Sequence, residues 1–254
     1  MDHWPVNRSG TELTLTEKVM VYVRDAVHSG AMPCDTWYSV YQLSEQLGVS
    51  RSPVRDALLR LEEAGLVRFT KNRGFQIVPT HPEDVAEIFA LRLGIEAPAA
   101  FRAARLLAAD AEALDAFRTA TQTLLEDLDA AASADDTELF FRLDTELHRL
   151  IVLTGRSERG WRFVEQLRTH TRILGPSTAG TSRSLEDIRR EHLPVIEAIL
   201  AGDAPGARQA MAAHVENTGR LLLRQALRRA GHPDPDSAVP AIWNAYVCGF
   251  SAEG

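Results

Sequence analysis

The chain has 254 residues, of which 45% are hydrophobic and 25% are charged, and its formal net charge is −7. This composition is typical of a soluble globular protein and excludes a disordered chain, a collagen-like repeat and a coiled-coil rod. No apolar run approaches the roughly 18 residues of a membrane helix, and the N-terminus lacks a secretory signal pattern, so no membrane partner is expected. Two cysteines cannot form a disulfide framework, which favours the cytoplasm as the location.

The positive charge is unevenly distributed. Residues 1–80 contain nine Lys or Arg and nine Asp or Glu, so the whole net charge belongs to residues 81–254. Within residues 51–73, six basic residues outnumber three acidic ones. A nucleic-acid-binding domain beside a second, non-binding domain would give this pattern, although an ordinary solvated surface would give it too.

The first 80 residues are expected to form three short helices and a β-hairpin. Hydrophobic periodicity, N-caps and glycine stops predict helices over residues 16–27, 40–47 and 51–64, followed by strands over 66–70 and 75–78. Gly48 ends the second helix, and Ser50 is a suitable N-cap for the third.

The second and third of these helices have the features of a helix-turn-helix, in which an apolar residue follows the glycine turn. Three apolar side chains would hold the third helix against the second: Val54, Leu58 and Leu61. Three other side chains would then face outward at its N-terminus: Arg51, Ser52 and Arg55. In a helix-turn-helix the second of the two helices, here residues 51–64, enters the major groove by its N-terminus. We therefore expect the three outward-facing residues to contact DNA.

The expected hairpin would form a wing beside this helix. Lys71 and Arg73 flank its tip, where Gly74 would let the backbone approach DNA closely. Arg51 and Arg55 lie one helical turn apart, and an arginine fork pairs with guanine or with phosphate. We therefore predict double-stranded operator DNA as a partner. A plain helical hairpin with a solvated basic face is the alternative.

The ungapped stretch over residues 43–58 resembles the winged-helix signature of GntR-type bacterial transcription regulators, although Asp56 stands where glutamate is commoner. The resemblance implies that Arg51 and Arg55 are the main DNA-contacting residues. The family usually has a charged residue just before this stretch, often an arginine that contacts DNA. This chain has Trp37-Tyr38-Ser39-Val40-Tyr41 there, which implies an altered operator or a tyrosine in that role.

From residue 83 onward the chain is rich in Ala, Leu, Glu and Arg and shows no convincing strand. Its breaks predict about six helices in an antiparallel bundle. The expected fold is therefore mainly α, with an N-terminal winged helix-turn-helix domain and a C-terminal all-α helical bundle. The expected boundaries are 1–80 for the first domain, 81–230 for the second and 231–254 for a peripheral C-terminal tail.

Four residues of the second domain are spaced as metal ligands would be. Asp144 and His148 are four residues apart and so share one helix face. His192 and His214 lie about 15 and 12 Å from the tight turn at 202–206, at nearly the same height on two antiparallel helices. Three imidazoles and one carboxylate suit zinc, nickel, manganese or iron(II), with zinc favoured. Each histidine could instead be an ordinary core or surface residue.

The helical part resembles the FCD ligand-binding domain of the FadR-type subgroup of the GntR family, in its shorter, VanR-like version. Asp144, His148, His192 and His214 match the metal motif of that domain one by one. The resemblance implies a small carboxylate effector bound in the bundle with its carboxylate on the metal. Three residues are candidate effector contacts, the first at a position where the family often has an arginine: Arg92, Arg168 and His170.

The expected function is a ligand-responsive transcription regulator, in this family mostly a repressor. A homodimer is expected because winged-helix modules usually recognise paired half-sites. A metal-dependent enzyme using the same four residues is a weaker interpretation, because the chain offers no clear general base beside them. A metal ion that only clamps the bundle is a third possibility.

Overall fold

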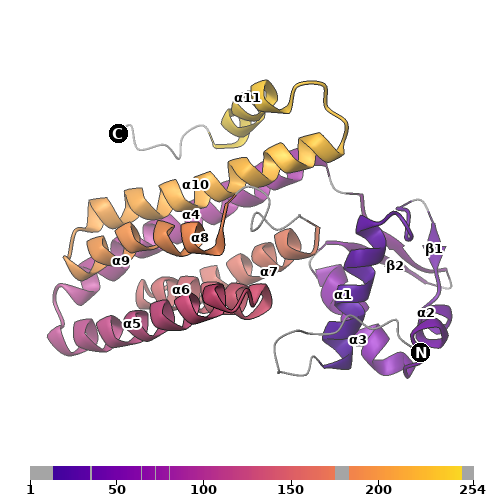
Figure 1. Cartoon of the computed structure of the whole chain (residues 1–254), viewed down its shortest axis with the longest axis horizontal. Helices are drawn as coiled ribbons and strands as arrows, with labels where there is room; N and C mark the ends of the chain where they lie inside the picture. The colour runs from indigo at the N-terminus through magenta and orange to yellow at the C-terminus, as the bar shows by residue number, and fades with distance from the viewer. Residues whose placement is uncertain are drawn as a thin grey trace. The chain divides into compact units, whose positions relative to one another are not determined.

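The computed structural model describes residues 14–34, 36–63, 65–71, 73–79, 81–174 and 183–247. Within these ranges the chain is mainly α-helical and contains one small sheet (Figure 1). Its contacts divide it into two compact units, Met1–Thr80 with Gln166–Gly175, and His81–Glu165 with Pro176–Gly254.

The first unit is a winged helix-turn-helix. Its elements are α1 (Leu15–His28), β1 (Trp37–Tyr38), α2 (Val40–Leu47), α3 (Arg51–Glu63), β2 (Val67–Thr70) and β3 (Gly74–Ile77). The strands pair antiparallel in the order β1-β3-β2. The expected helices and hairpin are present, whereas the sequence pattern did not indicate β1, because a strand of two residues is too short for alternation to be visible.

Local signals explain where the helices of this unit begin and end. Thr14 and Glu17 form a capping box at the start of α1. Ser39 caps α2, and Gly48 ends it in a left-handed conformation with φ of 65°. Buried side chains from α1, α2, α3 and the sheet then form one core, which includes Val19, Leu43, Leu58 and Phe75.

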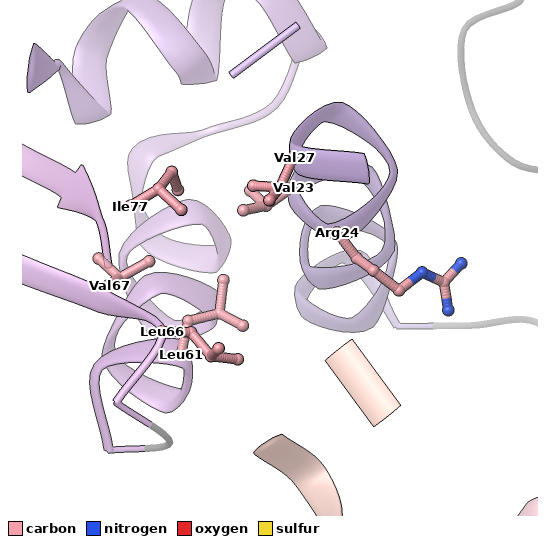
Figure 2. A pocket seen from close by; sticks show the side chains of 7 residues that line it. All are labelled: Val23, Arg24, Val27, Leu61, Leu66, Val67 and Ile77. Atoms are coloured by element: carbon pink, nitrogen blue, oxygen red, sulfur yellow. The ribbon is translucent and has the colours of Figure 1, made fainter. Parts of the chain in front are cut away.

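A small pocket opens into this core between α1 and the side formed by α3, β2 and β3 (Figure 2). Its lining is apolar except for one side chain: Val23, Arg24, Val27, Leu61, Leu66, Val67 and Ile77. Figure 2 shows the guanidinium of Arg24 directed away from the pocket, and its Nε lies 2.8 Å from Asp25. The pocket therefore offers no group suited to a carboxylate ligand.

Eight further helices follow in the described residues: α4 (Pro82–Leu107), α5 (Ala111–Ser133), α6 (Thr137–Thr154), α7 (Glu158–Leu174), α8 (Leu185–Glu191), α9 (Leu193–Leu200), α10 (Ala204–Arg229) and α11 (Pro235–Val247). In the second unit α4 is central and largely buried, and α10 packs along it (Figure 1). Helix α6 packs against α4 and α5, while α9 packs against α10 and α4. This arrangement brings α4, α6, α9 and α10 around one interior.

Helices α8 and α9 are separated only by His192, which is the C-cap of one and the N-cap of the other. Pro194 lies in the first turn of α9, where its missing N–H interrupts the helical hydrogen bonds. If α8 and α9 count as one interrupted helix, the described residues between 82 and 229 form the six expected helices. The predicted fold class is confirmed.

The expected tail after residue 230 contains a helix, α11, which the sequence pattern did not indicate. Trp243 of α11 is 1% exposed, and its ring centroid lies 6.5 Å from that of Phe89 in α4. Helix α11 packs against α10 and α4, and these long-range contacts bury its apolar face. The sequence pattern did not indicate α11 because the segment is rich in proline and because the helix is stabilised by partners outside the segment. The predicted domain boundaries themselves stay a prediction.

No helix in the described residues is both long enough and apolar enough to cross a membrane.

Candidate DNA-binding surface and metal centre

Helix α3 buries one side and exposes the other. Val54, Leu58 and Leu61 are fully buried in the core of the first unit. Three predicted DNA-contacting residues at the start of the helix are exposed: Arg51, Ser52 and Arg55. The structure therefore places them together on the solvent side of one helix terminus, where the backbone N–H groups also favour phosphate.

Lys71 and Arg73 are exposed in the turn between β2 and β3, as expected for a wing. Gly74 is the first residue of β3 and has φ of +99°. A Cβ atom at this position would lie 2.1 Å from the carbonyl oxygen of Tyr38 in β1. Packing against β1 thus requires a glycine here whether or not the backbone approaches DNA, a reason that the sequence pattern did not indicate.

Three imidazoles meet in the interior of the second unit. His148 comes from α6, His192 from the junction of α8 and α9, and His214 from α10. The Nε2 atom of His148 lies 3.2 Å from that of His214 and 3.3 Å from that of His192. Asp144, one turn before His148, places its Oδ1 3.1 Å from Nε2 of His192. The structure therefore brings together all four residues singled out as metal ligands.

The spacing of these atoms fits a metal ion. With metal–nitrogen bonds of about 2.0–2.1 Å, two ligand nitrogens on one ion lie about 2.9 Å apart at octahedral angles and about 3.3 Å apart at tetrahedral angles. The three imidazoles are buried, and their candidate ligand atoms lie within 4.8 Å of one another. A cation at the centre could be coordinated by all three Nε2 atoms.

Two carboxylates that the sequence pattern did not indicate support the histidines. Nδ1 of His148 contacts Oε2 of Glu96 in α4, and Nδ1 of His214 lies 3.1 Å from Oε2 of Glu191 in α8. An Nδ1–H that donates to a carboxylate leaves Nε2 as a lone pair, which is the tautomer a metal requires. Nδ1 of His192 is buried and has no hydrogen-bond partner in the described part of the chain.

Each supporting carboxylate is itself held in place. Nε of Arg92 lies 2.7 Å from Oε1 of Glu96, and both side chains are buried. Arg183 donates to Oε2 of Glu191 at 2.5 Å, and the side-chain amide of Asn217 donates to its Oε1 at 2.6 Å. Arg92 and Glu96 lie four residues apart on a helix, and this spacing is the sequence feature that could have indicated their ion pair.

Burial and neighbouring charges keep His214 in its neutral form. Burial, together with the neighbouring His192, lowers the pKa of His214 to about 3, although its hydrogen bond to Glu191 acts in the opposite direction. Burial alone would raise the pKa of Glu191, but hydrogen bonds from His214 and Arg183 outweigh burial and lower it. A neutral His214 beside an ionised Glu191 is the state suited to metal ligation.

The three candidate effector contacts have different surroundings. Arg92 is buried and engaged with Glu96, and its guanidinium also lies 4.8 Å from the ring centroid of Phe89. Arg168 and His170 belong to the part of α7 that clusters with the first unit. His170 lies against Gly65, where an added Cβ would be 3.7 Å from its ring. Their role in effector binding stays a prediction.

Comparison with known families divides the chain in the same order. Residues 15–77 match the family model described as bacterial regulatory proteins, gntR family, and residues 87–217 match the FCD domain. The second match spans α6, α9 and most of α10, and therefore includes all four residues of the proposed metal centre.

Several curated relatives are similar over most of their length. The uncharacterized HTH-type transcriptional regulator YdhC of Bacillus subtilis is 32% identical, over 68% of this chain and 75% of its own. The putative L-lactate dehydrogenase operon regulatory protein of Escherichia coli is 30% identical, over 75% and 79% respectively. The HTH-type transcriptional repressor RspR of Escherichia coli is 27% identical, over 76% and 82%.

Among solved structures, McbR/YncC of E. coli aligns with a TM-score of 0.60 at 22% identity, covering 84% of this chain and 99% of that one. At this level of identity the alignment shows a shared fold.

Proposed function

Because the chain belongs to the GntR family of bacterial regulatory proteins and carries an FCD domain, it is a DNA-binding transcription regulator, and we propose that a small carboxylate controls its affinity for operator DNA from a divalent metal site. The observation that carries the proposal is the convergence of His148, His192 and His214 through their Nε2 atoms, with Asp144 beside His192. Zinc is the favoured ion, with nickel or manganese as alternatives.

The donor set supports a sensing site. Four protein ligands would leave a position open on a five- or six-coordinate ion, which would attract the carboxylate of a small organic acid. The second carboxylate of a diacid would need a cation nearby, for which Arg92 is the candidate in the same unit. One relative is named for an L-lactate dehydrogenase operon, which makes L-lactate the first acid to test.

On DNA, we propose that Arg51, Ser52 and Arg55 contact base edges and phosphates in the major groove, and that Lys71, Arg73 and Gly74 contact DNA through the wing. A homodimer would place two such surfaces on paired half-sites. Effector binding would favour one arrangement of the helical domain and so change the spacing of the two surfaces. A repressor is the favoured mode because the relative RspR is named as one.

The decisive experiment is the metal content of the untagged protein, measured by elemental mass spectrometry after loading with zinc, nickel or manganese. We expect about one ion per chain in the wild type, loss of the ion in His148→Ala, and retention in His232→Ala, which removes an exposed histidine. Absence of metal in the wild type under every loading condition would overturn the metal site and leave the DNA-binding function standing.

A purely structural metal is the second candidate. It is favoured because Nδ1 of His148 and Nδ1 of His214 each contact a carboxylate, which holds both imidazoles in place. The two functions differ in a binding titration. The probe is a duplex selected by the full chain from a random-sequence library, titrated with L-lactate and other small carboxylic acids with and without metal. A regulator of the proposed kind changes its DNA affinity only when both acid and metal are present, whereas a clamp changes only its melting temperature with metal.

A further inference from the structure

Two arginines of the proposed DNA-binding surface lie over aromatic rings. Cζ of Arg51, at the start of α3, is 4.7 Å from the ring centroid of Tyr41 in the first turn of α2. Cζ of Arg73, in the turn before β3, is 5.2 Å from the ring centroid of Trp37 in β1. Both distances are within the range of about 6 Å at which a guanidinium and an aromatic ring attract each other.

Burial does not explain the position of the Tyr41 ring. Its side chain is 50% exposed, whereas Leu43 and Leu47 hold α2 in the core. A large aromatic side chain kept half in solvent at the edge of a helix-turn-helix contributes little to the core. Within the described residues, the guanidinium of Arg51 is the group that lies over this ring.

Trp37 lies beside the wing and is partly buried. It belongs to β1, which pairs with β3 through the register Trp37↔Gln76 and Tyr38↔Phe75. This pairing brings the indole beside the turn that carries Arg73. The short strand β1 thus connects the segment before the helix-turn-helix to the wing arginine.

A stacked arginine remains able to bind DNA. When a guanidinium stacks on a ring, the ring covers one face of its plane, while the N–H donors point outward from the edge of that plane. It is this edge that pairs with guanine or with a phosphate. Stacking restricts the rotamers of a long, exposed side chain and so reduces the conformational entropy that DNA binding would otherwise remove.

We propose that Tyr41 and Trp37 are positioning residues for DNA recognition, each holding one arginine in the orientation in which it meets the duplex. The inference rests on the proposed DNA contacts of Arg51 and Arg73 and adds the residues that orient them.

The test is a double-mutant cycle on the full chain, with the duplex selected by the wild type from a random-sequence library. Tyr41→Ala is expected to weaken binding by about two- to fivefold, the range of an exposed cation–π contact. Tyr41→Phe, which keeps the ring, is expected to bind like the wild type. Tyr246→Ala, which removes a tyrosine of 39% exposure from α11, is the matched control and should have no effect.

The coupling between the two residues separates positioning from a direct role. In an Arg51→Ala background, Tyr41→Ala should cause no further loss, because the ring then has no guanidinium to orient. An equal loss in both backgrounds would overturn the proposal and assign the ring a direct contact with DNA. The proposal would also be overturned if Tyr41→Ala lowered the melting temperature enough for loss of folded protein to explain its weaker DNA binding.

The pair of Trp37 and Arg73 is tested in the same way. Trp37→Phe keeps an aromatic ring, and Trp37→Ala is measured both in the wild type and in an Arg73→Ala background. Failure of the proposed DNA contacts has a different signature. In that case Arg51→Ala and Arg73→Ala would themselves leave binding unchanged. Normal losses for both arginine variants with no effect of either aromatic variant would overturn only the positioning role.

Discussion

Arg92 and Glu96 form a buried ion pair one turn apart in α4, with Nε of the arginine 2.7 Å from Oε1 of the glutamate. The other oxygen of Glu96 contacts Nδ1 of His148, 52 residues further along the chain. A buried guanidinium therefore holds a carboxylate in place, and that carboxylate orients one of the three clustered imidazoles. This relationship makes both residues testable parts of the proposed metal centre.

Glu96→Gln should weaken metal binding. The substitution removes the negative charge behind Nδ1 of His148, which raises the basicity of the metal-facing nitrogen, and the expected loss of metal affinity is about 10- to 100-fold. Competition with a chromophoric chelator measures it. Glu197→Gln, an exposed position on α9, is the control. Equal affinities of Glu96→Gln and the wild type would remove Glu96 from the metal centre.

Arg92→Ala should destabilise the fold, because it leaves Glu96 as an uncompensated buried charge. The expected decrease in the free energy of unfolding is about 3–5 kcal/mol, measured by urea denaturation of the metal-loaded protein. Arg149→Ala removes an exposed partner of Glu146 and should cost less than about 1 kcal/mol. Unchanged stability of Arg92→Ala with loss of the response to carboxylic acids would identify Arg92 as an effector contact instead.

Gly74→Ala should destabilise the first unit, since its Cβ would meet the carbonyl oxygen of Tyr38 and its φ is positive. We expect a loss of about 1–3 kcal/mol in thermal unfolding. Gly30→Ala separates the two causes, because Gly30 has φ of +76° but no atom within 4 Å of an added Cβ. A Gly74→Ala variant of normal stability that no longer binds DNA would instead favour a direct backbone contact.

Gly219→Ala should disturb the docking of α11. An added Cβ would lie 2.4 Å from Cη2 of Trp243 and 2.7 Å from Cγ of Phe89. Overpacking of this kind costs about 1–3 kcal/mol, which lowers the melting temperature. In a Trp243→Leu background the same substitution should cost less, and an equal cost in both backgrounds would contradict the packing explanation.

Arg51→Ala combined with Arg55→Ala should greatly weaken binding to the selected duplex. Its salt dependence indicates how the residues act, since the loss of each phosphate contact lowers the slope of log K against log salt by about 1. A loss of base preference at an unchanged slope would assign them to base edges. Arg190→Ala, an exposed arginine on α8, is the control. Unchanged binding by the double variant would reject α3 as the DNA-contacting helix.

Local signals in the sequence were sufficient for the helix-turn-helix. Gly48 ends α2 in a left-handed conformation, and the buried positions of α3 follow the helical repeat, because both depend on interactions within a few residues. The same repeat places Asp144 and His148 on one face of α6. Matched distances from a tight turn correctly indicated that His192 and His214 would meet, and their ring centroids lie 4.3 Å apart.

Tertiary structure alone decided the surroundings of these residues. Glu96 and Glu191 reach their histidines only because α4 packs against α6, and α8 lies beside α10, in the bundle. The helix after residue 230 exists because α4 and α10 bury Trp243, and the need for glycine at residue 74 arises from a strand more than 30 residues earlier. Spacing within a helix follows from backbone geometry and can be read from the chain, whereas partners between helices depend on how whole surfaces pack, which no local pattern encodes.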